Sequence, residues 1–179
     1  GSWRPYMRAE DLHRYWPMSG TEGTTHRLGG LEKDTNTGAI SNDPENHERM
    51  VMLRRRKVEN IANDIPQLDI CGNADADTLL VGWGGTYGHL RSACEELNAQ
   101  GTPVALAHFR YINPMPANTA EVLARYKRVI VAELNTGMFA DYLQCRYPDT
   151  RISRINKIQG QPFSVSELVE KTRKIMEEA

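Results

Sequence analysis

The chain has 179 residues, a formal net charge of −1, and charged side chains at 25% of its positions. This near-neutral balance favours neither nucleic acid nor an anionic membrane surface as a partner, and the longest apolar runs are too short to cross a bilayer. The cysteines stand far apart, without a CxxC pair or a ligand cluster, which predicts reduced structural thiols in a cytoplasmic protein without an iron–sulfur motif: Cys71, Cys94 and Cys145.

The N-terminal segment, residues 3–41, is expected to form an extended arm. It follows Gly1 and Ser2, which we interpret as the remnant of a tag-cleavage site, and the missing initiator Met favours a piece excised from the C-terminal part of a larger protein. The arm's aromatic residues are scattered among charges, prolines and glycines and need a partner surface: Trp3, Tyr6, Tyr15 and Trp16. A connecting arm is the simpler interpretation, and a substrate loop over residues 20–26 is the functional alternative.

The end of the arm has the pattern of a hairpin. Residues 35–38 read TNTG, a sequence typical of a turn. We therefore predict that residues 26–31 pair with residues 39–41.

A helix is predicted next, because Asp43 can cap its first turn and Pro44 suits its first position. The apolar spacing carries this helix to about Ala62. The basic run at residues 54–57 is expected to be a solvated face, since acidic residues surround it and no aromatic residue interrupts it. We assign residues 42–75 to this helix and a linker.

The stretch from Asp77 to Gly101 is the start of a βα unit. An apolar run at residues 78–81 predicts a buried strand, a glycine-rich turn follows at residues 82–88, and apolar residues then recur at helical spacing up to Leu97. Glycine is expected where a strand turns directly into a helix, because φ is positive there or the backbone approaches a neighbour closely. We expect Gly84 and Gly85 to be such positions.

The same rhythm continues to the end of the chain. Strands are predicted at residues 104–109, 129–134 and 152–155, and the intervening helices begin near Asn118, Met138 and Ser164. Strands that alternate with helices at this spacing predict an α/β domain over residues 76–179, with an open, mostly parallel sheet and helices on both faces.

Ligands of such sheets bind beyond the carboxyl ends of the strands. The residues expected there form the candidate ligand or interface turn, with Glu133 just before the last of them: Gly84, Gly85, Thr86, Arg110 and Asn135. No nucleophile, base and orienting group occur together, so no catalytic residue and no metal ligand is assigned. His89 and His108 are interpreted as packed, hydrogen-bonded histidines.

An anion or small-molecule site at the Gly82–Gly88 turn is the alternative function. A helix that starts after a glycine turn presents unpaired N–H groups and a positive dipole end. The dinucleotide fingerprint fails, however, because Tyr87 occupies its third glycine position and Arg110 follows the next strand instead of an acidic residue.

Four segments carry a family resemblance: LLVGWGGTYGHLRSACEELNAQG, HFRYINPMP, VIVAELNTGMFADYL and NKIQGQPF. In this order they resemble the C-terminal region of the alpha subunit of 2-oxoacid:ferredoxin oxidoreductases, the 2-oxoglutarate type above all, and residues 20–57 are similar to that subunit too. The resemblance implies a transketolase C-terminal-like domain. Met138 departs from the glutamine that the family commonly has after this glycine.

The resemblance also implies an activity for the parent complex. That complex converts 2-oxoglutarate and coenzyme A to succinyl-CoA and CO2 and passes electrons to ferredoxin, using thiamine diphosphate, Mg²⁺ and iron–sulfur clusters. This chain lacks the Gly-Asp-Gly metal–diphosphate motif and the cluster cysteines. We therefore expect a non-catalytic structural and assembly fragment without its own cofactor, whose partners are the beta subunit and the missing N-terminal domains of the alpha chain. A free-standing enzyme is the less favoured reading.

Overall fold

The computed structural model describes residues 3–178; the expected tag remnant, Gly1 and Ser2, lies outside these residues. The residue contacts divide the chain into two compact units, one ending at Asp64 and the other beginning at Ile65. We describe each unit by itself. Within residues 3–178, no helix is both long and apolar enough to span a membrane.

The N-terminal unit is built on helix α1 (Pro44–Asn60), which continues into the short 3-10 helix η1 (Ile61–Asn63). The helix begins as predicted: Asp43 Oδ1 accepts a hydrogen bond from the Glu45 N–H at 3.0 Å, and Pro44 occupies the first position. Met50 of α1 is buried, whereas other apolar residues of α1 and η1 are exposed: Val51, Met52, Val58 and Ile61.

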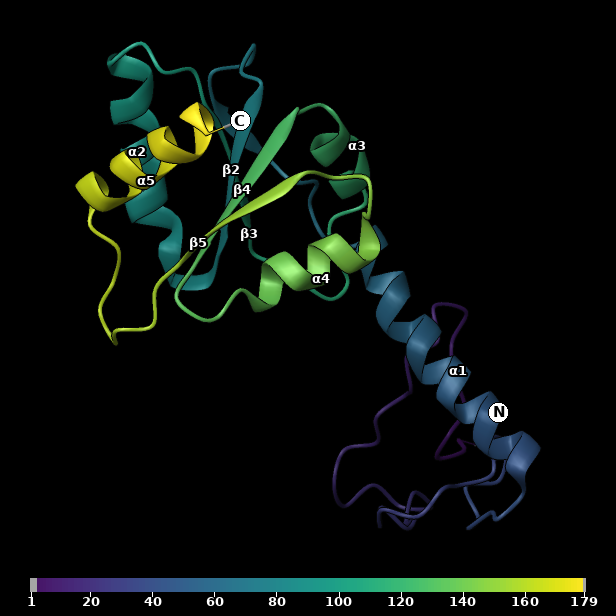
Figure 1. Cartoon of the computed structure of the whole chain (residues 1–179). Helices are drawn as coiled ribbons and strands as arrows, with labels where there is room; N and C mark the ends of the chain where they lie inside the picture. Colours follow the sequence, from purple (N-terminus) through teal and green to yellow (C-terminus); the bar gives the residue numbers. More distant parts are fainter. Residues whose placement is uncertain (1–2, 179) are drawn as a thin grey trace. The chain divides into compact units, whose positions relative to one another are not determined.

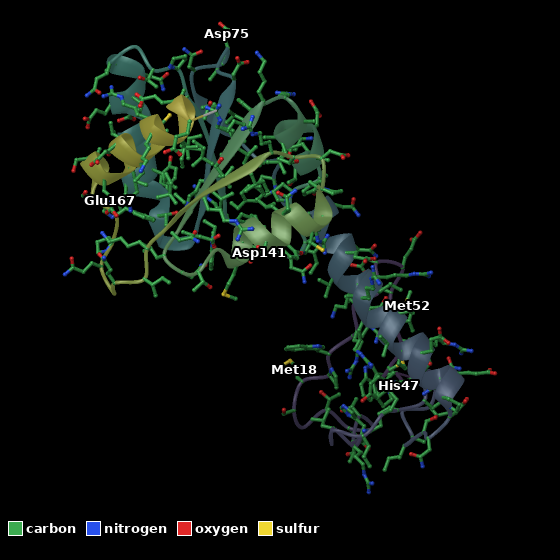
Figure 2. The ribbon with its side chains drawn as sticks, in the orientation of Figure 1. Met18, His47, Met52, Asp75, Asp141 and Glu167 are labelled. Carbon is green, nitrogen blue, oxygen red and sulfur yellow. The ribbon has the colours of Figure 1, made fainter. Side chains whose placement is uncertain are left out.

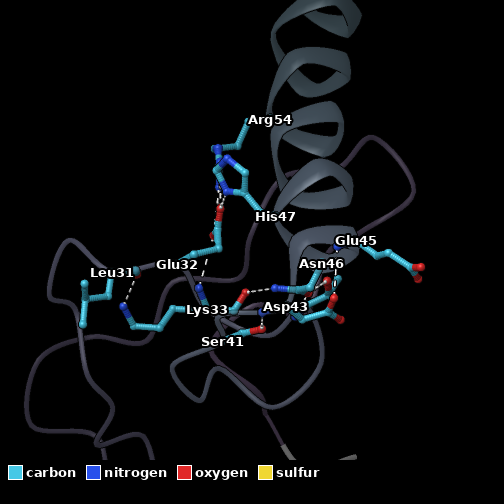
Figure 3. A network of polar contacts seen from close by, with 10 residues as sticks. Leu31, Glu32, Lys33, Ser41, Asp43, Glu45, Asn46, His47 and Arg54 are labelled. Carbon is cyan, nitrogen blue, oxygen red and sulfur yellow. Dashed lines mark hydrogen bonds and ion pairs between the residues drawn. The ribbon is translucent and has the colours of Figure 1, made fainter.

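Polar contacts hold the arm against the start of α1 (Figure 3). Lys33 is 1% exposed, and its ammonium group donates to the carbonyl oxygens of Gly29, at 2.7 Å, and of Leu31. Asn46 of α1 donates to the Lys33 carbonyl at 2.9 Å and accepts from the Thr35 hydroxyl at 2.9 Å. The arm therefore has a fixed structure of its own, although it contains almost no regular secondary structure.

A second contact in the same network is ionic. Glu32 pairs with His47 at 2.9 Å and with Arg54 at 3.1 Å, both on α1. These hydrogen bonds, that of Arg54 first, lower the pKa of Glu32 to about 2. One residue of the predicted basic run thus anchors the arm.

The predicted hairpin is wrong in its extent. Lys33 and Ile40 form a single antiparallel bridge, and the Asp34 N–H donates to the Ala39 carbonyl at 2.8 Å. Residues 26–31 form no strand. The reason is local: the Asp34 carboxylate accepts from the N–H groups of Asn36 and Thr37, which makes a compact turn that ends after one bridge.

The second unit contains a five-stranded sheet in the order β1-β3-β2-β4-β5. Four strands run parallel to one another: β2 (Thr78–Trp83), β3 (Ala105–Phe109), β4 (Arg128–Glu133) and β5 (Ile152–Asn156). The edge strand β1 (Ile70–Gly72) pairs antiparallel with β3, with Cys71 opposite Leu106. The sheet thus has β1 at one edge and β5 at the other.

Helices cover both faces of this sheet (Figure 1). On one side lie α2 (Tyr87–Ala99) and α5 (Val165–Glu177), whose buried residues pack with Leu80, Leu106 and Ile130 of the strands. On the other side lie α3 (Thr119–Ala124) and α4 (Met138–Arg146), above Val81, Ala107 and Val131. The expected fold class, an open α/β sheet with helices on both faces, is confirmed, and each predicted strand and helix of this part is present.

One element was missed, because the segment expected to be a linker contains β1. Its three residues are too few to show a periodic pattern, and they lie between turn-forming residues. Two contacts fix the strand's ends: the Leu68 N–H donates to Asn118 Oδ1 at 2.8 Å, and the Asn73 N–H donates to the Val104 carbonyl at 3.0 Å. Such long-range partners cannot be predicted from local sequence.

Candidate functional site

The sheet has one place where ligands of such folds usually bind. After β2 the chain turns into α2 on one face, and after β4 it turns into α4 on the opposite face. Neighbouring parallel strands whose connections leave in opposite directions create a crevice at their carboxyl ends. In this chain, Trp83 and Glu133 stand at those two ends.

Glu133 fills the crevice from within. Its carboxylate is 0% exposed and accepts hydrogen bonds from the Phe139 and Ala140 N–H groups, both at 3.0 Å. The indole N–H of Trp83 donates to the same carboxylate at 3.3 Å. The Phe139 and Trp83 rings lie 6.2 Å apart, so aromatic surface packs beside these hydrogen bonds. The positive end of α4 therefore holds an anion that belongs to the chain itself.

Asn135 completes this arrangement. Its Oδ1 atom accepts from the Gly137 N–H at 2.7 Å and from the Met138 N–H at 3.0 Å. With the two bonds to Glu133, four successive backbone N–H groups at the start of α4 have side-chain acceptors from this chain. The predicted site residue Asn135 is thus engaged as a helix cap, while the Met138 side chain remains exposed.

The glycine turn after β2 separates into positions with different requirements. A Cβ atom at Gly82 would lie 2.1 Å from Leu90 Cδ1 and 2.6 Å from Thr86 Oγ1, so Gly82 is required by close packing. Gly84 has φ +58°, a conformation that favours glycine. Gly85 has neither feature, and open space surrounds its Cα, so the expectation of a constrained backbone is wrong for Gly85.

Thr86 joins this turn to β3. Its hydroxyl donates to the Trp83 carbonyl at 2.9 Å and accepts from the Trp83 N–H at 3.2 Å. The His108 Nε2 atom lies 3.4 Å from the same oxygen. Because the single hydroxyl hydrogen is directed to the Trp83 carbonyl, a bond to His108 requires that Nε2 carries a proton and donates it. The interpretation of His108 as a packed, hydrogen-bonded histidine agrees with this contact.

His108 also lines a cavity of about 150 Å³ on the outer side of β3. Arg110, two residues further along, lines the same cavity, as does Tyr87 at the start of α2. Burial, and next the charge of Arg110, lower the pKa of His108 below its ordinary value. The imidazole is therefore neutral at neutral pH, and the Arg110 guanidinium is the cationic group of the cavity wall.

Residues 76–168 match a family model described as pyruvate:ferredoxin oxidoreductase core domain II, which covers just over half of the chain. The chain belongs to this family.

Relatives of core domain II extend the match beyond the sheet unit. The chain is 42% identical to the 2-oxoglutarate oxidoreductase subunit KorA of Mycobacterium tuberculosis over 92% of its length, and 33% identical to subunit alpha of 2-oxoacid:ferredoxin oxidoreductase 1 of Aeropyrum pernix over 86%. It spans about a quarter of the length of these curated relatives.

A solved structure resembles the core domain II chain along almost its whole length. This is the 2-oxoglutarate:ferredoxin oxidoreductase of Magnetococcus marinus, with 2-oxoglutarate, coenzyme A and succinyl-CoA bound. The TM-score is 0.87 at 28% identity, and the similarity covers 97% of this chain and 31% of that one. The match confirms that this chain is a fragment of the alpha subunit type of these oxidoreductases.

The residues of the candidate turn do not form a single site in this core domain II chain. Gly84, Gly85 and Thr86 connect through His108 to the cavity that Arg110 lines, whereas Asn135 belongs to the cap of α4. Whether any of these residues contacts a ligand or a partner stays a prediction. Sequence reasoning missed Trp83, whose backbone N–H donates to Thr86 in the turn and whose indole N–H donates to Glu133 beside the cap of α4.

Iron–sulfur clusters and metal ions are held by side chains that stand close together. Among residues 3–178, no three His, Cys, Asp or Glu side chains are grouped so that they could hold a metal ion. Cys94 is buried, and burial raises its pKa to about 11, which disfavours the thiolate that a cluster needs. Among the described residues, therefore, no group of thiolate or imidazole ligands is placed to hold an iron–sulfur cluster.

Proposed function

We propose that this chain is a non-catalytic structural and assembly part of the alpha subunit of a thiamine-diphosphate-dependent 2-oxoacid:ferredoxin oxidoreductase. The similarity to KorA and to the Magnetococcus marinus enzyme favours 2-oxoglutarate as the 2-oxoacid. The parent complex then oxidises 2-oxoglutarate in the presence of coenzyme A, forms succinyl-CoA and CO2, and transfers two electrons to ferredoxin. Thiamine diphosphate, Mg²⁺ and the iron–sulfur clusters belong to other parts of that complex.

One observation supports the non-catalytic role more than any other. The crevice where an α/β sheet usually receives its ligand is occupied by Glu133 and Trp83, and the start of α4 is capped by the chain's own side chains. A substrate or cofactor that entered this crevice would have to displace a fully buried carboxylate from three hydrogen bonds. A ligand-binding role at the Gly82–Gly88 turn is correspondingly less favoured.

The contacts of this part would be made by exposed apolar side chains of the arm. Trp16 is 90% exposed and Met18, labelled in Figure 2, is 82% exposed, and both border an open hollow that residues 19–26 and Leu28 also line. Large apolar side chains gathered at a surface mark an interaction site. We assign this surface to a contact with the N-terminal domains of the parent alpha chain.

The arm's other aromatic residues have partners within the arm. The indole N–H of Trp3 donates to the Tyr15 carbonyl at 3.0 Å, and the Arg14 guanidinium lies 4.3 Å from the centre of the Tyr6 ring. Of the four aromatic residues of the arm that were expected to need a partner surface, Trp16 is therefore the one that we assign to that contact. On the sheet unit, the exposed backbone at Gly84 and Gly85 is the surface that we assign to the beta subunit.

The decisive experiment compares this chain with the complete complex. Calorimetric titration with thiamine diphosphate and Mg²⁺ and a viologen-reduction assay with 2-oxoglutarate and coenzyme A should give no signal for the chain alone. Full-length alpha subunit joined to its beta partner should reduce the viologen. Saturable binding of thiamine diphosphate, or substrate-dependent reduction, by the chain alone would overturn the non-catalytic role. A complex that is active with another 2-oxoacid and not with 2-oxoglutarate would overturn the substrate.

A further inference from the structure

The cavity beside Arg110 has a structural origin in the edge of the sheet. Side chains two residues apart on a strand share a face. Leu106 and His108 of β3 therefore stand in one row, and Arg110, the residue directly after the strand, continues it along the same cavity. This row faces the same side as α2, whose first residue Tyr87 forms another wall. Strand β1 pairs with β3 through only three residues, and beyond it the segment before Ile70 closes the cavity.

The walls of the cavity combine apolar, polar and charged side chains, the polar and acidic ones including Gln67, Asp69 and Tyr111. Pro66, Leu68, Leu106 and Pro116 give it an apolar side. Arg110 contributes a guanidinium group, for which no ion pair or hydrogen bond is found among residues 3–178. A wall that combines apolar surface with one unpaired cation matches a ligand with an apolar body and a negative end.

The volume limits the size of that ligand. The cavity measures about 150 Å³, which is below the usual range for drug-sized ligands and comparable to an engineered cavity that holds benzene, a molecule of about six non-hydrogen atoms. A nucleotide or coenzyme A is therefore too large to be contained in it.

We propose that this cavity binds a short-chain monocarboxylate, with the carboxylate on the Arg110 guanidinium and the carbon chain against Leu68 and Leu106. Guanidinium groups bind carboxylates through two parallel N–H···O bonds, which gives the site its preference for this group. Asp69 also lines the cavity, and its negative charge opposes any anion, a dianion more strongly than a monoanion. A single carboxylate is thereby preferred over a dianion such as phosphate. The site is independent of the proposed assembly role, so its failure would leave that role unchanged.

Butyrate, with six non-hydrogen atoms, is the probe. The 179-residue chain would be titrated while its backbone amide signals are followed by NMR, and saturable shifts are expected at Tyr87, His108 and Arg110, with a dissociation constant on the order of millimolar. Arg110→Gln, at an exposed position that leaves the fold intact, should weaken the binding by about tenfold or more. Arg125→Gln removes an exposed arginine of similar kind from the C-terminal end of α3 and should change nothing.

Two further ligands test whether binding depends on the carbon chain alone or on the charge alone. Butan-1-ol has the same carbon chain without the charge, and inorganic phosphate has the charge without the chain. Both should bind at least about tenfold more weakly than butyrate. Equal binding of butan-1-ol would show a merely apolar cavity, and equal binding of phosphate would show a non-selective cation. Either result overturns the proposal. So would a butyrate titration in which the amide shifts are absent or lie elsewhere, or in which Arg110→Gln binds butyrate as well as the unmodified chain.

Discussion

The indole N–H of Trp83, the last residue of β2, donates to the buried carboxylate of Glu133, the last residue of β4, over 3.3 Å. The two strands are neighbours in the sheet, and their connections leave toward opposite faces. This hydrogen bond therefore spans the crevice that related architectures leave open for a ligand. The carboxylate also holds the start of α4, so the closure of the crevice and the position of that helix depend on the same group.

Replacing Glu133 by Gln should destabilise the sheet unit by about 2–3 kcal/mol. The carboxylate accepts from three donors, and an amide of the same shape offers one oxygen as an acceptor and turns an N–H₂ group toward the N–H groups of α4. Urea unfolding followed by circular dichroism measures the change. Glu121→Gln, at an exposed position on α3, is the control and should stay within about 0.5 kcal/mol of the unmodified chain. A Glu133→Gln protein as stable as the control would contradict the role of this carboxylate.

The glycines of the turn should respond to alanine in a definite order. Gly82→Ala places a methyl group 2.1 Å from a side-chain atom of the fully buried Leu90 and should cost about 1–3 kcal/mol. Gly84→Ala should cost roughly 1 kcal/mol, since its φ is positive. Gly85→Ala should be neutral or slightly stabilising, because open space surrounds it. Thermal melts of the three variants test the order, and a Gly85→Ala protein less stable than Gly82→Ala would refute it.

The N-terminal unit should lose stability in acid. The pKa of Glu32 is lowered to about 2 in the folded chain from an ordinary value of 4.5, so its contribution is fully present above about pH 5 and is lost as the pH falls toward 2. We expect at most about 1 kcal/mol, because Arg54 and His47 are half exposed and water screens the pair. Hydrogen exchange of the α1 amides at pH 6, 4 and 3 measures it.

Variants at two arm carboxylates make this pH test specific. Glu32→Gln should lower the protection of the α1 amides, relative to an unstructured peptide, at pH 6 and flatten the dependence of that protection on pH. Glu22→Gln changes an exposed carboxylate, and its amide protection should depend on pH as it does in the unmodified chain. The same slope in all three proteins would exclude Glu32 as its origin.

Truncations test where the sheet unit begins. A chain that starts at Ile65 keeps β1 and the hydrogen bonds between Leu68 and Asn118, at 2.8 and 3.1 Å, and should melt cooperatively near the temperature of the full sheet unit. A chain that starts at Ala76, the domain boundary predicted from sequence, should still fold but melt several degrees lower, since it exposes the edge of β3. Differential scanning calorimetry distinguishes the two, and equal melting temperatures would show that β1 adds nothing.

Trp16 should matter for assembly and not for folding. At 90% exposure, Trp16→Ser should leave the melting temperature of this chain unchanged. In the full-length alpha subunit, the same substitution should weaken the packing of the arm on the N-terminal domains, which limited proteolysis of the arm would reveal. Tyr15→Ser, at a less exposed neighbour whose carbonyl is used by Trp3, is the comparison for a change within the arm itself. Unchanged proteolysis of the Trp16→Ser subunit would argue against a contact at this residue.

The elements that the sequence predicted correctly are those whose signal is local. The helical spacing of Leu90, Ala93 and Leu97 and the capping residues Asp43 and Ser164 determine structure within a few positions of themselves. Strand β1 and the arm were predicted poorly because distant partners hold them: Val104 and Asn118 for the segment around β1, and Asn46 for Lys33. The family resemblance named the chain's origin, which periodicity alone does not provide.

For the candidate site, too, local features could be predicted from the sequence and long-range contacts could not. Strand ends were located correctly, but whether their polar groups are free depends on which side chains meet across the sheet. Asn135 was a candidate ligand residue in the sequence, with Glu133 noted just before it, and both accept hydrogen bonds from the backbone of α4 in the structure. The alternation of Leu106, His108 and Arg110 was available in the sequence as a sign of a shared face, and it identifies the row that lines the cavity.

The two outer strands of the sheet affect how this chain behaves at high concentration. Strand β1 is only three residues long and ends at Gly72, whose φ is +93°, so it offers little backbone to a neighbouring molecule. Strand β5 carries the exposed Arg154 within it, paired with Asp141 at 2.6 Å, so a second copy that approached along this edge would meet charged side chains. Short and charged borders of this kind keep a sheet from adding further strands, which favours a protein that stays dispersed when it is separated from its partners.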